Sequence, residues 1–284
     1  MCRFLAYAGK PILMAELLTR PDISLIKQSY RARERAEPLN GDGFGVGWYM
    51  PEIDPTPCVV TSITPAWSSR NLHRLAEKIV TPRLFAHVRA ASPGMLVSEP
   101  NCHPFQHGRY LWMHNGTMAE FHKVKRRLRA SLRDDLYEFI QGTTDSEHVF
   151  AVFLNLLGDP SESYSPEDLR RAMFSTVRRL DAWSEEAGAR GPSFYNFAVT
   201  DGRSVVATRY VSDEALEPLS LYYSSGARFE CRDGACRMVR AEPEDRAVIV
   251  TSEPLTELRE DWLKVPKNHA VVVTPGLDVR LSPV

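Results

Sequence analysis

Short hydrophobic runs gather at both ends of this 284-residue chain, whereas its middle shows helical periodicity. Runs of aromatic and β-branched residues, bounded by Gly, Pro, Asn and Asp, predict strands in the first part. They lie at residues 2–8, 44–50, 58–63, 84–88 and 110–113. The same pattern returns towards the C-terminus and predicts strands at residues 194–200, 204–210, 219–224, 247–251 and 270–274.

Apolar residues at helical spacing predict helices, most of them between these two sets of strands. They cover residues 69–79, 119–132, 145–157 and 166–187. Because sheets and helices must bury their apolar faces against another layer, we expect an α+β fold of two stacked sheets covered by helices. No internal repeat or long linker divides the chain, so a single domain over residues 2–284 is predicted instead of the roughly two that length alone suggests.

The composition excludes several classes of protein. Hydrophobic residues make up 43% and charged residues 25%, as in ordinary globular proteins. The net charge of -1 argues against a nucleic-acid partner, and the basic run at 123–129 is offset by acidic residues soon after it. We find no signal peptide and no apolar run long enough to cross a membrane. Five irregularly spaced cysteines predict reduced thiols and a cytoplasmic protein without a membrane partner.

A cysteine at position 2 directly follows the initiating methionine. Methionine before a small residue is commonly removed, so we expect Met1 to be lost and Cys2 to carry a free α-amino group. That amine titrates near about 7.7 to 8.0, so it can accept the proton of its own thiol and activate it as a nucleophile. An idle thiol is the alternative for an isolated cysteine. The strand predicted at 2–8 favours the catalytic role because it would hold the terminus in place.

Three further segments hold groups that such a nucleophile needs. The side-chain amide of Asn115 and the backbone N–H of Gly116 could stabilise an oxyanion, although Asn-Gly also predicts a type I′ turn. The guanidinium of Arg89 could bind a substrate carboxylate through two hydrogen bonds, and a surface or ion-paired arginine is the alternative. The carboxylate of Asp145 could bind a substrate ammonium, and it could also cap a helix.

The chain resembles the class II glutamine amidotransferases through five motifs in the expected order. They are Met1-Cys2, His87-Val-Arg89, Asn101-Cys-His103-Pro104-Phe, His114-Asn115-Gly116 and Thr144-Asp145-Ser-Glu147. The resemblance covers roughly residues 2 to 150, and extends more weakly to 250–255 and 262–266. It implies a four-layer αββα fold of the N-terminal-nucleophile hydrolase type.

The resemblance also implies a reaction. Cys2 would attack a γ-glutamyl amide such as glutamine and form a thioester, while Asn115 and Gly116 would form the oxyanion hole. This chemistry needs no cofactor.

Substrate binding would fall to residues that match other positions of the family. Arg89 would bind the α-carboxylate with help from Ser92, and Asp145 would bind the α-ammonium. His103 would shape the pocket and would not act as a base. One difference stands directly after the arginine: many members that use glutamine carry an aromatic residue there, and this chain has Ala90. A roomier pocket for a small-molecule γ-glutamyl substrate is therefore expected.

Three hypotheses about function remain at this point. The first is a γ-glutamyl amide hydrolase similar to the stand-alone enzymes of ergothioneine and glutathione metabolism. Ala90 and the absence of a phosphate-binding loop, isomerase or synthetase region favour it slightly. The second is a glutaminase subunit that delivers ammonia to an acceptor enzyme on another chain. The third is an inactive binding or scaffold protein, which the presence of every expected site residue argues against.

A metal site is the remaining chemical alternative. It would draw on cysteine and histidine residues, namely Cys102, His103, His107, Cys231 and Cys236. Adjacent Cys-His and Cys-x₄-Cys are not the usual zinc spacings, so no metal is expected.

Overall fold

The computed structural model describes residues 2–34, 39–92, 94–232, 235–240, 242 and 245–284. Its paired strands run antiparallel and form two sheets. The first sheet contains, in spatial order, β10 (Ala235–Arg240), β9 (Tyr222–Arg232), β11 (Ala247–Thr251), β1 (Arg3–Leu13), β4 (Val80–Val88), β2 (Phe44–Met50) and β3 (Asp54–Ser62), with β12 (Leu263–Lys264) paired to β9. The second contains β14 (Val279–Pro283), β13 (His269–Val273), β8 (Val205–Arg209), β7 (Phe194–Thr200), β6 (Tyr110–Thr117) and β5 (Phe105–His107).

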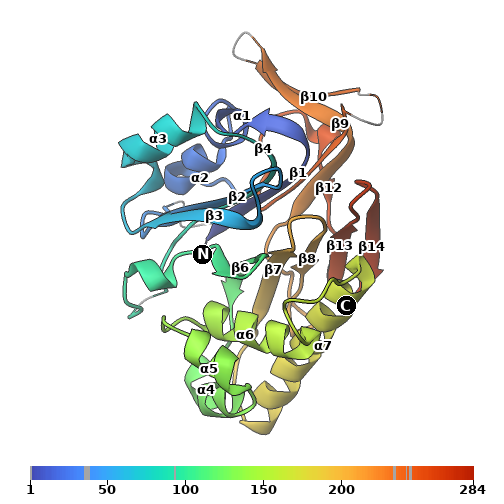
Figure 1. Ribbon diagram of the computed structural model, residues 1–284. Coiled ribbons are helices and arrows are strands. Elements are labelled where there is room, and N and C mark those ends of the chain that lie inside the picture. The colour runs from blue at the N-terminus through green and yellow to red at the C-terminus, as the bar shows by residue number, and fades with distance from the viewer. Residues whose placement is uncertain (1, 35–38, 93, 233–234, 241, 243–244) are drawn as a thin grey trace.

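Helices cover the outer face of each sheet (Figure 1). The first sheet is covered by α1 (Ala15–Leu18), α2 (Leu25–Arg31) and α3 (Arg70–Ala76). The second is covered by α4 (Phe121–Ala130), α5 (Asp134–Phe139), α6 (Asp145–Leu157) and α7 (Pro166–Glu186). The α+β fold and its αββα layer order are thus confirmed. None of the described helices is both long and apolar enough to cross a membrane.

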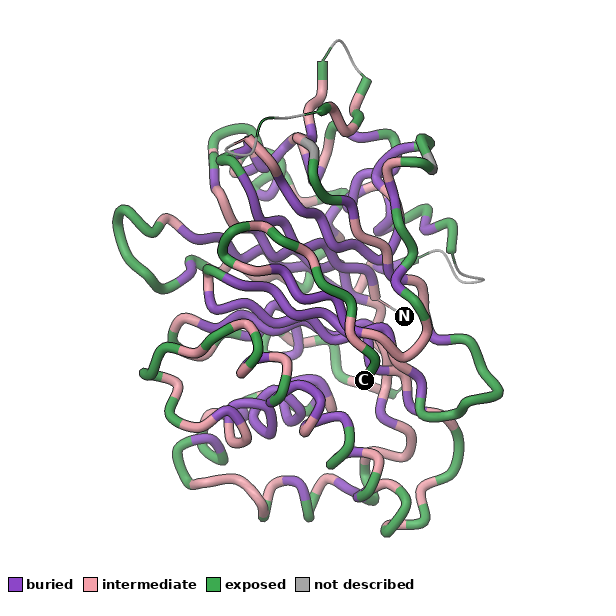
Figure 2. The backbone as a smooth tube through the Cα atoms, turned by 90° about the vertical axis from the view of Figure 1, so that its right-hand side faces the viewer, coloured by how far each residue is buried: buried purple, intermediate pink, exposed green. Residues whose placement is uncertain are grey.

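Each boundary between layers has its own hydrophobic core, and β1 contributes to two of them. Phe4, Ala6 and Ala8 pack between the sheets. Leu5 and Tyr7 point the other way and pack against the helices of the first sheet. Successive side chains of a strand face opposite sides, so a strand buried on both faces carries apolar side chains at successive positions, as Phe4 to Ala8 do. Figure 2 shows this burial along the central strands.

Two glycines of β2 allow the sheets to approach closely. A Cβ atom at Gly45 would lie 2.1 Å from the carbonyl oxygen of His103, and one at Gly47 would lie 2.7 Å from Cδ1 of Leu111. The distance at Gly45 is shorter than packed backbone atoms allow, so only glycine fits there, whereas at Gly47 the Leu111 side chain would have to shift. The close backbone approach that glycine in this strand predicts is confirmed at Gly45.

The predicted end of the strand at 110–113 is wrong. β6 continues to Thr117 because Asn115 pairs with Asn196 and Gly116 pairs with Tyr195 of β7. The type I′ turn that Asn-Gly favours is therefore not formed, since a neighbouring strand overrides the local preference. As a result, Asn115 and Gly116 belong to a strand that is paired with β7.

Two cysteines that we expected to be reduced form a disulfide. Cys231 of β9 and Cys236 of β10 lie directly opposite each other in an antiparallel pair, with Cα atoms 4.0 Å apart. Facing residues of such a pair come close enough for a disulfide, a proximity that spacing alone did not reveal. Cys2, Cys58 and Cys102 are free thiols.

Candidate active site

Cys2 directly precedes β1, which begins at Arg3. Its side chain is half-buried, and its sulfur accepts a hydrogen bond from the backbone N–H of Ala90 at 3.4 Å. The pairing of Arg3 with Val88 between β1 and β4 brings these two segments together. The predicted loss of Met1 falls outside the described residues and stays a prediction.

The segment that follows β4 places Arg89 one residue from this sulfur contact. Arg89 is only 3% exposed, and its guanidinium donates to the carbonyl oxygens of Asp42 at 3.3 Å and Leu96 at 3.2 Å. No carboxylate of the described residues forms an ion pair with it. A buried cation is normally paired, so this guanidinium is suited to bind an external carboxylate.

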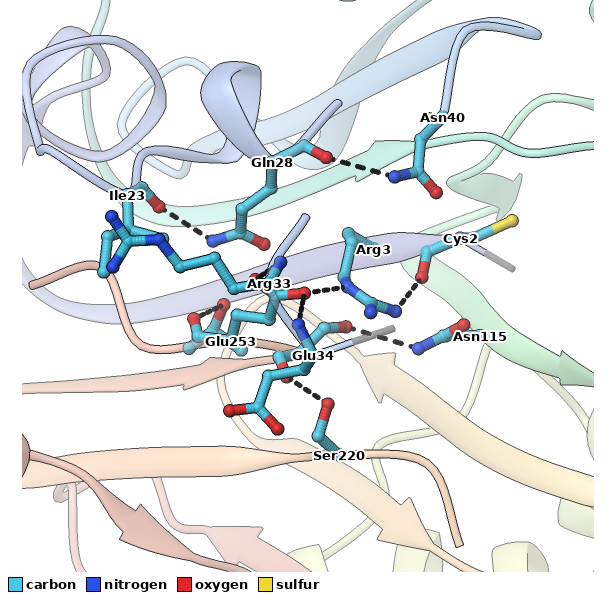
Figure 3. A network of polar contacts seen from close by, with 12 residues as sticks. Cys2, Arg3, Ile23, Gln28, Arg33, Glu34, Asn40, Asn115, Ser220 and Glu253 are labelled. Atoms are coloured by element: carbon cyan, nitrogen blue, oxygen red, sulfur yellow. Dashed lines mark hydrogen bonds and ion pairs between the residues drawn. The ribbon is translucent and has the colours of Figure 1, made fainter. Parts of the chain in front are cut away.

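Asn115 comes from the facing sheet and is fully buried. Its side-chain N–H donates to the hydroxyl of Ser252 at 3.5 Å, the same oxygen that accepts the backbone N–H of Phe4. Asn115 thus lies beside the start of β1 (Figure 3). Its long bond to Ser252 leaves the amide well placed to donate to a better acceptor, such as an oxyanion.

Gly116 occupies a position in which a side chain cannot fit. A Cβ atom there would lie 1.9 Å from the carbonyl oxygen of Phe194. We expect Gly116→Ala to lower the free energy of unfolding by about 1–3 kcal/mol, because the strands must separate to accept the methyl group. Urea denaturation would measure this loss. Gly276→Ala is the control, since the nearest atom to its Cβ would be 3.7 Å away. Equal stability of the two variants would contradict the expectation.

Asp145 is the first residue of α6, and Thr144 is the N-cap, with its hydroxyl accepting the N–H of Glu147 at 3.3 Å. The Asp145 carboxylate accepts the backbone N–H groups of Ser146 and Met118, each at 2.7 Å. Because Met118 follows β6, the second bond ties the helix to the strand that carries Asn115. The N-cap alternative for Asp145 is therefore wrong, and its carboxylate is held in a fixed direction.

His103 is buried and stacks on His87, with ring centroids 4.2 Å apart. Burial holds the pKa of His103 well below its usual range, so the ring is neutral and a poor general base at neutral pH. Ser92, in contrast, is exposed on the loop after Arg89. The structure thus brings Cys2 into contact with Ala90, the residue after Arg89, and places Asn115 beside the start of β1, whereas Ser92 lies at the surface.

The stacked histidines predict that the protein loses stability in acid. Burial lowers the pKa of His87 to about 3, whereas an unfolded chain titrates near 6.5. Between these values only the unfolded state binds the proton, so stability falls as pH drops below about 6.5. For His87 the loss between pH 7 and pH 5 is about 2 kcal/mol. Urea denaturation at several pH values would measure the free energy of unfolding. Its dependence on pH should be smaller in His87→Gln than in the wild type, and should be unchanged in His73→Gln, a control at an exposed position. A pH dependence unaffected by His87→Gln would contradict this assignment.

Several polar residues around the site were not predicted from the sequence. The carboxylate of Asp42 accepts the N–H of Ala91 at 2.8 Å and so fixes the loop beside Arg89. Ser252 and Glu253 follow β11 and contact Asn115 and Arg3. The motif at 250–255 pointed to this segment, but not to a role for it. Within the described ranges, no group of three or more acidic, cysteine or histidine side chains is arranged to hold a metal ion.

Sequence comparison places this geometry among known proteins. The family model described as class II glutamine amidotransferases matches residues 1–282. The probable glutamine amidotransferase DUG3 of Saccharomyces cerevisiae is 42% identical over 292 residues, which cover 96% of this chain and 82% of the yeast protein. The γ-glutamyl-hercynylcysteine sulfoxide hydrolase of Mycobacterium tuberculosis is 33% identical over 119 residues, which cover 42% of this chain and 50% of that enzyme.

A solved structure shows the same fold. The glutamine aminotransferase class-II domain protein of Silicibacter pomeroyi superposes with a TM-score of 0.67 at 22% identity, and the match covers 99% of each chain. The family match extends over nearly the whole sequence and agrees with the layer order of the fold. The chain is therefore an amidohydrolase that belongs to the class II glutamine amidotransferases.

Proposed function

We propose that this enzyme hydrolyses a γ-glutamyl amide bond through a thioester on Cys2. The observation that carries the proposal is the place of the buried Arg89, which forms no ion pair with a carboxylate of the described residues and directly precedes the residue that binds the Cys2 sulfur. Ala90, the residue after Arg89, donates its N–H to that sulfur at 3.4 Å. A γ-glutamyl group whose α-carboxylate lies on Arg89 can therefore extend its side-chain amide towards the nucleophile.

The reaction begins when the α-amine of Cys2, free after removal of Met1, accepts the thiol proton. The thiolate attacks the amide carbon, and the oxygen takes up the negative charge as a C–S bond forms. The side-chain N–H of Asn115 and the backbone N–H of Gly116 donate to this oxyanion. The C–N bond then breaks, and the α-ammonium returns the proton to the leaving amine. Water, activated by the same amine, hydrolyses the thioester to the free acid and regenerates the thiol.

Recognition of the γ-glutamyl group uses both of its α-substituents. Arg89 binds the α-carboxylate, with help from Ser92, which is exposed on the loop after Arg89. The fixed carboxylate of Asp145 binds the α-ammonium, and neutral His103 shapes the pocket. These two opposite charges favour an amide that carries both a free α-carboxylate and a free α-ammonium group over an amide that lacks them.

Release of glutamate tests the proposal. The purified protein is incubated separately with glutamine, with γ-glutamyl amides of larger amines, and with α-glutamyl amides as a control. We expect glutamate from the γ-glutamyl compounds and none from the α-linked control. Equal cleavage of both linkages, or cleavage of neither, would contradict the proposed recognition.

The second candidate is a glutaminase subunit that supplies ammonia to a separate acceptor enzyme. The name of the 42% identical yeast relative, a probable glutamine amidotransferase, favours it. In this case glutamine alone would be cleaved, and larger leaving amines would be rejected. Comparing the kcat/KM values of these two substrates therefore separates the candidates.

A further inference from the structure

Glu253 lies where three separate segments of the chain meet (Figure 3). It is 1% exposed and follows β11. One carboxylate oxygen accepts the Nε–H of Arg3 at 2.6 Å and the backbone N–H of Glu34 at 3.1 Å. The other accepts the backbone N–H of Arg33 at 2.9 Å. One side chain thus connects the start of β1 with the segment that follows α2.

Arg3 links Glu253 to Cys2, the proposed nucleophile. Its guanidinium is buried, and while Nε binds Glu253, Nη1 donates to the carbonyl oxygen of Cys2 at 2.9 Å. This second bond matters because the register of β1 with β4 begins at Arg3, one residue after Cys2. The backbone of Cys2 therefore lies beyond the paired part of β1 and gains a restraint from the Arg3 side chain.

Ser252, the residue before Glu253, contacts Asn115, the proposed oxyanion donor. Its hydroxyl oxygen accepts the N–H of Phe4 at 3.1 Å and the side-chain N–H of Asn115 at 3.5 Å. Its carbonyl oxygen accepts the hydroxyl of Ser220 at 2.9 Å. Glu253 therefore contacts the proposed nucleophile through Arg3, and the preceding residue, Ser252, contacts the proposed oxyanion donor directly.

We propose that Glu253 is a positioning residue that acts through Arg3 to fix the backbone of Cys2 relative to Asn115. This inference rests on the proposed function, since it requires Cys2 to be the nucleophile. A purely structural ion pair is the competing explanation. Buried ion pairs are often no more stabilising than apolar residues of similar size, so stability alone gives little reason for this one. A positioning role explains why the Arg3 guanidinium also donates to the carbonyl oxygen of Cys2.

The test compares Glu253→Gln with the double variant Arg3→Met/Glu253→Gln. The single variant leaves Arg3 buried without a counter-charge, which threatens the fold, whereas the double variant removes both charges. In the double variant we expect kcat for a γ-glutamyl amide to fall about 10²-fold, because small displacements of reacting groups cost that much, with KM little changed. Labelling of Cys2 by 6-diazo-5-oxo-norleucine should slow in parallel, while alkylation by iodoacetamide, which needs no oxyanion donor, should keep its rate.

Asp181→Asn serves as the matched control, because Asp181 is a partly buried acid on α7 that binds the hydroxyl of Tyr210. Its kcat should equal that of the wild type. A folded double variant with wild-type kcat would overturn the positioning role and leave the ion pair purely structural. If wild-type Cys2 itself is not labelled by the γ-glutamyl electrophile, the proposed function is contradicted and this inference falls with it. The labelling and kinetic results therefore separate failure of the positioning role from failure of the proposed function.

Discussion

Replacing Cys2 by alanine should lower the rate of γ-glutamyl amide hydrolysis by at least about 10⁴-fold, the scale seen when a catalytic nucleophile is removed. The sulfur is the atom that forms the thioester, and alanine offers no replacement for it. The α-amine remains, but without a thiol it has no proton to accept. Glutamate release under saturating substrate would measure the loss, and circular dichroism would verify the fold.

Two other free cysteines provide controls for this result. Cys58 is exposed and Cys102 is buried, and neither is placed in the proposed mechanism. Burial raises the pKa of the Cys102 thiol to about 11, so it is protonated and unreactive at neutral pH. Cys58→Ala should therefore retain wild-type activity. Activity that survives Cys2→Ala but is lost in Cys58→Ala would contradict the assignment of the nucleophile.

Replacing Asn115 by alanine should lower kcat by about 10²–10³-fold, the usual effect of removing one oxyanion donor, with a smaller change in KM. The amide is held on a strand of the second sheet and is fully buried, so water cannot readily take its place. Because the oxyanion exists only after the attack, the donor stabilises the transition state more than the bound substrate. Steady-state kinetics would separate the two parameters.

Asn196→Ala is the matched control for this experiment. Asn196 is also fully buried and pairs with Asn115 across β6 and β7. Its side-chain N–H groups donate to the carbonyl oxygens of Leu219 and Ser220, each at 3.1 Å, and not to the site. We expect this variant to lose stability but to keep kcat. An equal fall of kcat in both variants would point to a general loss of sheet packing instead of a lost oxyanion donor.

Local patterns were sufficient for much of the fold. The strands at Phe44–Met50, Phe194–Thr200 and Ala247–Thr251 and the helix at Asp145–Leu157 have the predicted bounds. Each has clear periodicity or a continuous apolar run, together with turn residues at its ends. Short elements without such a pattern, such as α1, α5 and β5, were not predicted. They depend on packing against neighbours, which a local pattern does not contain.

For the site, too, local patterns revealed some residues and not others. Cys2, Arg89, Asn115, Gly116 and Asp145 were found because each lies in a recognisable motif. Their roles in catalysis and binding stay predictions, as do the single domain over 2–284, the acceptor enzyme and the cytoplasmic location.

The supporting residues of the site required the structure. Glu253 lies 250 positions from Arg3 in the sequence, and Ser252 lies 137 positions from Asn115. No local spacing indicates that these residues meet. They come together because β11 pairs with β1 and the second sheet packs against that pair.

Mass spectrometry of the intact and digested protein tests directly whether Cys2 is the N-terminal nucleophile. The protein is analysed before and after incubation with 6-diazo-5-oxo-norleucine, and the adduct is mapped to a peptide. We expect a chain that begins at Cys2 and carries a single adduct on this residue, with Cys58 and Cys102 unmodified. A chain that retains Met1 and acquires no adduct on Cys2 would contradict this expectation, and would favour a binding protein without this catalytic activity.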